Sequence, residues 1–149
     1  PANCILIPVK NDPYHKTAYA DGYFFASPMV VNIADVEELN FYPNSFASLS
    51  TEDKKFLVTK EVERMQKKAA ARQKENPAHV RNNIKAKFIT INGENCLKVS
   101  FDLSMSTEVD YIFVRDGKFI SFDYQYTFKD AKRLKAAVEK SANSIRFSK

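Results

Sequence analysis

Two short dipeptides, Asn92-Gly93 and Asp116-Gly117, constrain the fold of this chain more than any other feature. Each is flanked on both sides by segments in which apolar and polar residues alternate. Asn-Gly and Asp-Gly readily supply the two positive φ angles of a type I′ turn, the connection that suits a two-residue β-hairpin. The sequence therefore predicts two tight hairpins, joined in a four-stranded antiparallel meander over residues 84–127.

The two turns also predict which residues face each other across the hairpins. The expected pairs are Ile84–Phe101, Ala86–Val99, Phe88–Leu97, Val109–Tyr124, Tyr111–Phe122 and Phe113–Ile120. Between the hairpins, we expect residues 105–107 to form a three-residue loop that pairs Leu103 with Val109. These pairs join apolar residues to apolar residues, and a slip of one residue would move each apolar set to the other face. We therefore expect one apolar and one polar face.

Two helices are expected to accompany the meander. Ser50 or Thr51 can cap the first one, which Pro77 ends because proline cannot continue a helical hydrogen-bond ladder. Its expected apolar stripe is Val58, Val62, Met65 and Ala69. The second helix is expected over residues 128–144, with a buried stripe of Ala131, Leu134, Val138, Ala142 and Ile145. We expect it to pack on the apolar face, and the first helix to join it there or to cover the other face.

Short strands are predicted before the first helix, over residues 4–9, 22–27 and 29–33, and a turn at residues 11–13. The chain has 149 residues and no linker or internal repeat, so we expect a single domain over 1–149. The fold class is α+β: an antiparallel sheet packed against a long middle helix and a C-terminal helix.

The predicted register places a row of three carboxylates on the polar face, Asp102, Asp110 and Asp123. Like charges on neighbouring strands cost stability unless something compensates for them. The alternatives are solvent and nearby lysines, a partner or a helix that supplies Lys or Arg across the sheet, or a divalent cation, since carboxylate oxygens suit Ca²⁺, Mg²⁺ and Mn²⁺. The same row would carry the chemistry if the protein were a metal-dependent enzyme.

The polar face is also the candidate binding surface. It combines lysines with an apolar patch near the second tight turn, and the residues proposed for binding are Lys85, Lys87, Lys98, Ile112, Val114 and Phe119. The patch, which also includes Ile89, is either covered by the N-terminal strands or a helix, or exposed for docking another protein.

The two cysteines, Cys4 and Cys96, are too few for a disulfide framework. They form one bridge if the N-terminal strand crosses the polar face; otherwise Cys96 is a free thiol. The chain starts at Pro1 rather than at Met, which favours a protein whose signal peptide has been removed. We therefore expect a secreted or periplasmic protein, with a cytoplasmic location as the alternative.

Composition argues against several functions. There are 3 glycines and neither a GxGxxG nor a GxxxxGK motif, so no phosphate-binding loop and no cofactor is expected. No apolar run is long enough to span a membrane. The net charge of +5 comes from lysines that are dispersed among acids, which disfavours nucleic acid as a partner. The sequence gives no indication of a small ligand.

Some segments resemble the PsbP family, which includes extrinsic photosystem II proteins, a Ran-binding nuclear import factor and exported bacterial proteins. The resembling segments are Asp21–Pro28 (DGYFFASP), Tyr111–Tyr124 (YIFVRDGKFISFDY) and the end of the closing helix, Asn143–Phe147 (NSIRF). The resemblance implies a central antiparallel sheet with helices on both sides. It also implies a binding or accessory role rather than catalysis, and it transfers no functional residue.

We therefore expect a non-enzymatic binding or accessory protein, bacterial and exported, that acts through a surface for another protein. An inhibitor or immunity-type protein that neutralises an enzyme or toxin is one alternative. A metal-dependent enzyme that uses Asp102, Asp110 and Asp123 is another.

Overall fold

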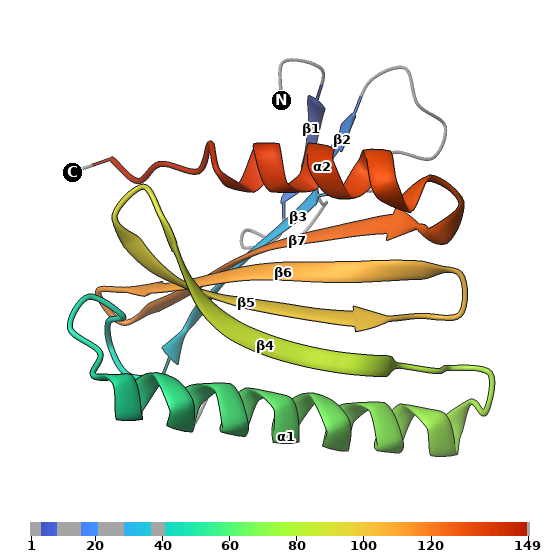
Figure 1. Cartoon of the computed structure of the whole chain (residues 1–149), viewed down its shortest axis with the longest axis horizontal. Coiled ribbons are helices and arrows are strands. Elements are labelled where there is room, and N and C mark those ends of the chain that lie inside the picture. Colours follow the sequence, from blue (N-terminus) through green and yellow to red (C-terminus); the bar gives the residue numbers. More distant parts are fainter. Residues whose placement is uncertain (1–3, 9–15, 21–28, 37–40, 149) are drawn as a thin grey trace.

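The computed structural model describes residues 4–8, 16–20, 29–36 and 41–148 of the chain. One antiparallel sheet of seven strands lies between two helices (Figure 1). The strands are β1 (Cys4–Pro8), β2 (Lys16–Ala20), β3 (Met29–Asp35), β4 (Asn82–Ile91), β5 (Glu94–Asp102), β6 (Ser106–Arg115) and β7 (Lys118–Thr127), and the helices are α1 (Thr51–Glu75) and α2 (Ala131–Ala142). This architecture confirms the predicted α+β fold. The turn expected at 11–13 and the strand expected at 22–27 lie outside the described residues.

The sheet has the strand order β1-β2-β3-β7-β6-β5-β4, so the meander β4–β7 forms one half of it and the N-terminal strands extend it beyond β7. The two predicted tight turns are confirmed: φ is 50° at Asn92 and 84° at Gly93, and 49° at Asp116 and 73° at Gly117. These are the left-handed values of type I′ turns. They set the register of each hairpin.

All three pairs predicted for the second hairpin are present, as are Phe88–Leu97 and Ala86–Val99 in the first. The pair Ile84–Phe101 is not formed, because the register of β4 against β5 shifts between Asn82 and Lys85. Asn83 has a φ of 52° within that shift. A bulge of this kind changes the facing residues locally and leaves the rest of the ladder intact.

The predicted connection between the hairpins is wrong. The loop has two residues, Ser104 and Met105, and the N–H of Leu103 donates to the carbonyl of Ser106 at 2.7 Å. Ser100, rather than Leu103, is therefore the partner of Val109. Nothing in the sequence marked this turn, because neither residue of the loop is Gly, Asn or Asp and neither has a positive φ.

The observed register of β5 against β6 differs from the predicted one by three residues. Because three is an odd number, this difference exchanges the faces of one hairpin relative to the other. Leu97 and Val99 lie on one side of the sheet, while Tyr111 and Tyr124 lie on the other, in separate core clusters. The prediction of one apolar and one polar face is therefore wrong. Each face is instead apolar over one hairpin and mixed over the other, where Ile112 and Val114 extend the first core and Ile91 and Cys96 extend the second.

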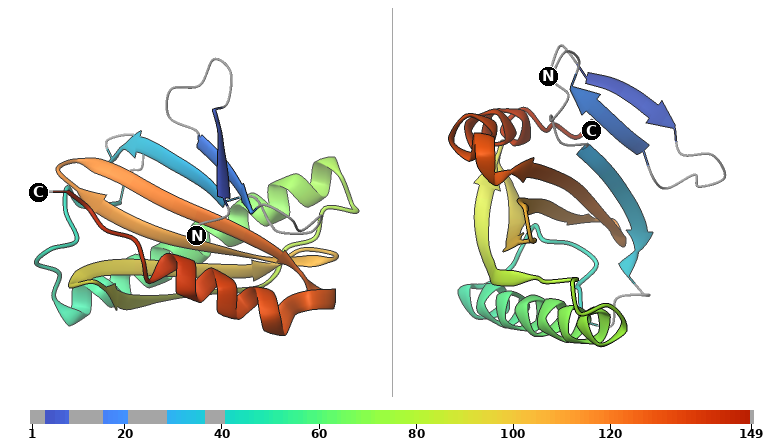
Figure 2. Two further views of the ribbon diagram at one scale, coloured as in Figure 1. Left: turned by 90° about the horizontal axis from the view of Figure 1, so that it is seen from above. Right: turned by 90° about the vertical axis from the view of Figure 1, so that its right-hand side faces the viewer.

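The helices follow this division, as the views in Figures 1 and 2 show. Helix α1 runs along β4 and covers the apolar side chains of the first hairpin, and α2 lies on the opposite face along β7 and covers those of the second. A helix is about 10 Å wide and strands are about 4.8 Å apart, so one helix covers roughly two strands. The two strands that each helix does not run along carry most of the polar side chains of that face.

Helix α1 begins at the predicted cap. The Ser50 side chain accepts from the N–H of Asp53, and the Asp53 carboxylate accepts from the N–H of Ser50, both at 3.0 Å. The buried line along the helix is Leu57, Glu61 and Met65. Of the predicted stripe, Met65 is buried and Val58 packs against the core, while the line as a whole is turned toward Leu57 and Glu61. Glu61 is tolerated inside because Arg64 and the Tyr42 hydroxyl both donate to it, the latter at 2.8 Å.

Helix α2 follows a short 3₁₀ turn, η2 (Phe128–Asp130), and buries Leu134, Val138 and Ala142, as predicted. The Tyr124 and Ser141 hydroxyls lie 3.0 Å apart and join the helix to β7. Of the apolar patch expected near the second turn, Ile112, Val114 and Phe119 are covered by residues 41–49 and by α1, whereas Ile89 lies on the opposite face in the core beneath α2. Phe46 donates to the carbonyl of Val114 at 3.0 Å, and the Tyr42 ring meets that of Phe119 edge to face at 5.2 Å.

We predict that Gly117→Ala lowers the free energy of unfolding by about 1 kcal/mol, because a residue with a Cβ is strained at a φ of 73°. No atom lies within 4 Å of an added Cβ, so the backbone angle alone sets the cost. Gly117→Asn is the matched control and should lose less, since asparagine tolerates the left-handed region. Urea denaturation measures both. Equal losses would contradict the assigned turn geometry.

Candidate functional site

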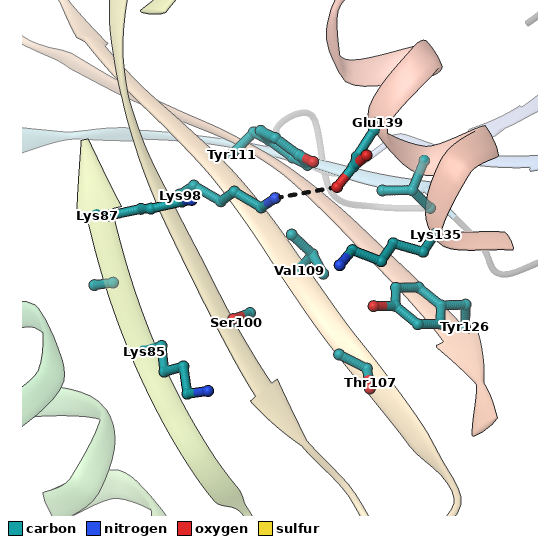
Figure 3. A pocket seen from close by; sticks show the side chains of 12 residues that line it. Lys85, Lys87, Lys98, Ser100, Thr107, Val109, Tyr111, Tyr126, Lys135 and Glu139 are labelled. Carbon is teal, nitrogen blue, oxygen red and sulfur yellow. Dashed lines mark ion pairs between the residues drawn. The ribbon is translucent and has the colours of Figure 1, made fainter. Parts of the chain in front are cut away.

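A groove lined by lysines lies beside α2, on the face where β4 and β5 are not covered by a helix (Figure 3). Its volume is about 530 Å³. Its polar lining consists of Lys85, Lys87, Lys98, Lys135, Glu139, Ser100, Thr107, Tyr111 and Tyr126. The groove therefore combines four ammonium groups with four hydroxyl groups.

The strands and the helix position these side chains in different ways. Lys85 and Lys87 are two residues apart on β4 and so point to the same side of the sheet. Lys87 faces Lys98 directly across the ladder. Like charges opposite each other cost stability, so this pair is not explained by the needs of the sheet. Lys135 and Glu139 are one turn apart on α2 and complete the opposite wall.

Lys98 is the fixed member of the set. Its Nζ lies 3.8 Å from Glu139 Oε1 and 5.5 Å from the centre of the Tyr111 ring, and 19% of its side chain is exposed. Glu139 is the one carboxylate among the described residues that line the groove. The groove is consequently positive, with one cation held in place and three exposed lysines around it.

The tyrosines of the groove serve as hydrogen-bond donors. Burial, and to a smaller extent the nearby Glu139 carboxylate, raise the pKa of the Tyr111 phenol above its ordinary value. Burial also raises the pKa of Tyr126. Both phenols therefore keep their protons at neutral pH, as do the hydroxyls of Ser100 and Thr107. Ammonium and hydroxyl donors together suit an anionic ligand.

The six residues predicted as a binding surface do not share one face. Lys85, Lys87 and Lys98 line the groove. Ile112 and Val114 lie on the other face, only 2% and 1% exposed, in the core beneath α1. Phe119 packs at the edge of the same core. The register of β5 against β6 explains the separation.

The predicted carboxylate row is also divided. Asp110 and Asp123 are directly paired across β6 and β7, as expected. Asp102 lies on the other face, where its carboxylate accepts from Thr107 Oγ1 and Asn83 Nδ2, both at 2.8 Å. No group of three metal-ligating side chains occurs among the described residues. The three aspartates therefore do not form the single row that was predicted.

The remaining two aspartates line a second cavity of about 510 Å³, between α1 and strands β3, β7 and β6. Asn32 and Ser121 both donate to the Asp123 carboxylate. Burial, and then the Asp123 charge, raise the pKa of Asp110 well above its ordinary value. Burial and Asp123 also raise the pKa of Glu108, on the same face. We call this the acidic cavity, defined by Glu108, Asp110 and Asp123.

Cys96 is a free thiol with no exposed surface. β1, which carries Cys4, is separated from β5 by β2, β3, β7 and β6. Strands are about 4.8 Å apart, so the distance between the Cα atoms of Cys4 and Cys96 exceeds the roughly 7 Å limit of a disulfide. The predicted bridge is therefore wrong, and the free-thiol alternative applies.

Sequence reasoning missed Lys135 and Glu139 in the groove and Arg64, Lys68 and Arg81 in the acidic cavity. These residues come from the helices or from the segment before β4, and their position depends on where each helix packs. A partial signal was present: Lys135 and Glu139 are four residues apart beside the buried stripe of α2, at the border of its polar side.

Comparisons with known proteins support the fold. The chain is similar in structure to cyanobacterial PsbP (CyanoP) from Synechocystis sp. PCC 6803, with a TM-score of 0.66 and 14% sequence identity. The match covers 99% of this chain and 84% of that one. No family model and no curated protein matches the sequence. The chain thus has a PsbP-like fold, as the sequence resemblance implied, and no helix among the described residues has the length and apolarity of a membrane span.

We predict that Asp110→Asn raises the free energy of unfolding at pH 7 by about 1 kcal/mol or more, because the neutral amide removes a charge that burial and Asp123 disfavour in the folded state. The folded-state pKa of Asp110 is raised, so its ionisation disfavours the folded state as pH rises through that value. Below the ordinary value of 3.8 the cost is absent, so the gain of the variant should shrink on acidification.

Urea denaturation of both proteins between pH 7 and pH 4 measures this difference. Asp102→Asn is the matched control, because that carboxylate accepts two hydrogen bonds and its replacement should give no gain. A gain for Asp110→Asn that is independent of pH would contradict the assignment.

We predict that Cys96 resists modification in the folded protein. Burial raises the pKa of its thiol to about 12, and the thiolate is the reactive form. In a Cys4→Ser variant, Cys96 is the sole thiol, so its reaction with a disulfide reagent at pH 8 can be followed directly. It should react readily in denaturant and more than a hundredfold more slowly without it. Similar rates in both conditions would show that Cys96 is accessible.

Proposed function

We propose that this protein is a non-enzymatic binding protein whose lysine-lined groove holds an acidic segment of a partner protein. The observation that carries the proposal is the convergence of Lys85, Lys87, Lys98 and Lys135 on one groove with a single carboxylate among its described lining residues. Figure 3 shows the Lys85 and Lys135 side chains reaching toward the middle of the groove from opposite walls.

The charge distribution favours a partner over a purely structural role. Three of the lysines are exposed, and the only ion pair found for the set among the described residues joins Lys98 to Glu139. Lys87 and Lys98 repel each other across the ladder, and an anionic ligand would relieve that repulsion. Complementary charge of this kind contributes chiefly to the rate and specificity of association.

The shape of the groove favours an extended segment. It runs across β4, the edge strand of the sheet, and its ammonium groups lie on β4, β5 and α2, while its hydroxyl groups lie on β5, β6 and β7. Carboxylate side chains of an extended chain would meet the ammonium groups, and its backbone carbonyls would meet the hydroxyls. None of the lining residues forms the nucleophile–base pair that a hydrolytic role would require.

The fold is compatible with this role, since it resembles that of cyanobacterial PsbP. An exported, bacterial setting remains part of the proposal. It rests on the sequence expectation alone, and cell fractionation of the source organism would test it.

Binding of a short glutamate-rich peptide tests the groove. We predict that the peptide binds the native protein, that added salt weakens binding, and that the double substitution Lys87→Glu with Lys135→Glu weakens it at least about tenfold, or ~1.4 kcal/mol. Fluorescence anisotropy measures the affinity. Glutamate keeps the edge strand charged, so a loss of binding would not reflect altered pairing of β4.

The matched control is Lys67→Glu with Lys74→Glu, which makes the same change in net charge on exposed positions of α1. It should leave binding nearly unchanged. An equal loss in both double variants would show that net charge alone attracts the peptide. Tighter binding of an oligonucleotide of equal charge would refute the choice of an acidic protein as the partner.

A further inference from the structure

Strand β4 is the last strand on its side of the sheet, and no further strand pairs with it among the described residues (Figure 1). Its inner neighbour is β5, and the register of that pair determines which backbone groups of β4 are used. In a two-residue hairpin the residues that flank the turn exchange both of their hydrogen bonds, and bonded and non-bonded pairs then alternate along the strands. The Asn92-Gly93 turn therefore assigns the bonded positions to Ile91 and to every second residue before it, as far as Lys85.

The residues between these positions direct their N–H and C=O groups away from β5, to the free edge of the sheet. Ala86, Phe88 and Thr90 occupy these places. No backbone hydrogen bond outside the strand ladders engages any of the three within the described part of the chain. A row of unpaired donors and acceptors on an edge strand is the surface to which an extended chain adds as a further strand.

Two lysines determine which chain this edge accepts. Lys85 and Lys87 are exposed and point from β4 to the face of the groove. A second copy of this protein that paired edge to edge would bring its own β4 lysines beside them, and like charges on neighbouring strands oppose pairing. A segment with acidic side chains at every second position would instead meet both ammonium groups. The two lysines thus disfavour self-association and select an acidic strand.

The other side of the edge is apolar. Ile84, Ala86 and Phe88 belong to the core beneath α1 but are only partly buried. Val58 of α1 packs against the same core, and Val62, one turn later on the same side of the helix, is also half-buried. Apolar side chains of an added strand would cover the surface that these five residues leave exposed.

We propose that the free edge of β4 is a second docking surface, which takes an antiparallel strand of a partner protein in which acidic and apolar residues alternate. The acidic side chains lie beside Lys85 and Lys87, and the apolar ones lie against Ala86, Phe88 and Val58. The antiparallel direction continues the pairing found between β4 and β5 and throughout the meander. This surface goes beyond the proposed function, because it needs neither the far wall of the groove nor its hydroxyl groups.

The test uses a short peptide in which glutamate and valine alternate, with fluorescence anisotropy as the measurement. In an antiparallel pair the residue opposite Phe88 exchanges hydrogen bonds with it and points to the same face, so the valines carry the N–H groups that bond to β4. We expect N-methylation of the valine amides to weaken binding at least about tenfold, and N-methylation of as many glutamate amides to weaken it less than about twofold. A peptide with the same residues in separate blocks should bind as weakly as the valine-methylated one.

Two variants separate this surface from the groove. Ala86→Pro removes an N–H that faces the free edge and keeps the ladder with β5, so it should abolish binding of the alternating peptide. Lys135→Glu changes the far wall of the groove and should leave the affinity for that peptide nearly unchanged. With the glutamate-rich peptide the two variants should exchange roles, since Lys135→Glu weakens its binding and Ala86→Pro does not.

Equal losses from the two methylated series would overturn the proposal, since strand pairing is what distinguishes the valine amides from the glutamate amides. Equal affinity for the alternating and the block peptides would also overturn it, by showing that charge alone attracts them. If Ala86→Pro fails to fold, the methylated peptides still decide the result, because they leave the protein unchanged. The glutamate-rich peptide reports on the groove, so failure of either proposal leaves the other standing.

Discussion

The register between β5 and β6 is the constraint on which the rest of this structure depends. The backbone pairing of Leu103 with Ser106 around a two-residue turn sets which side of the sheet each hairpin turns toward. Because the apolar sets of the two hairpins point in opposite directions, one helix alone cannot cover both sets. The fold requires α1 on one side and α2 on the other, each over a different pair of strands.

The polar features follow from the same geometry. A helix covers about two strands, and each face of the meander has four. The half of each face that remains uncovered is where Lys85 and Lys98 lie on one side and Asp110 and Asp123 on the other. The lysine-lined groove and the acidic cavity are thus products of a single arrangement, placed diagonally across the sheet. The buried Glu61 is held by Tyr42 and Arg64, and it joins residues 41–49 to α1 on the face of the acidic cavity.

Sequence reasoning predicted the parts of this structure that local chemistry determines. Asn-Gly and Asp-Gly turns specified both hairpins, the Ser50 cap specified the start of α1, and the spacing of Leu134 and Val138 specified the inner face of α2. It failed where packing between distant parts of the chain decides the structure. The Ser104-Met105 turn has no residue that demands a special backbone conformation, and alternation cannot identify the buried face of a sheet that is covered on both sides. The split of Asp102 from Asp110 and of Lys98 from Ile112 came from that single turn.

Strand β6 lies between the two polar sites and contributes to both through alternate positions. Thr107, Val109 and Tyr111 line the groove, whereas Glu108, Asp110 and Ile112 line the cavity. Neighbouring residues of this one strand therefore line two sites on opposite faces of the sheet. Substitutions at odd positions can reshape the groove while even positions preserve the cavity, so descendants of this chain are free to diversify each side separately. The limit on that freedom is an insertion or deletion of one residue within the strand, which would exchange the two linings at once.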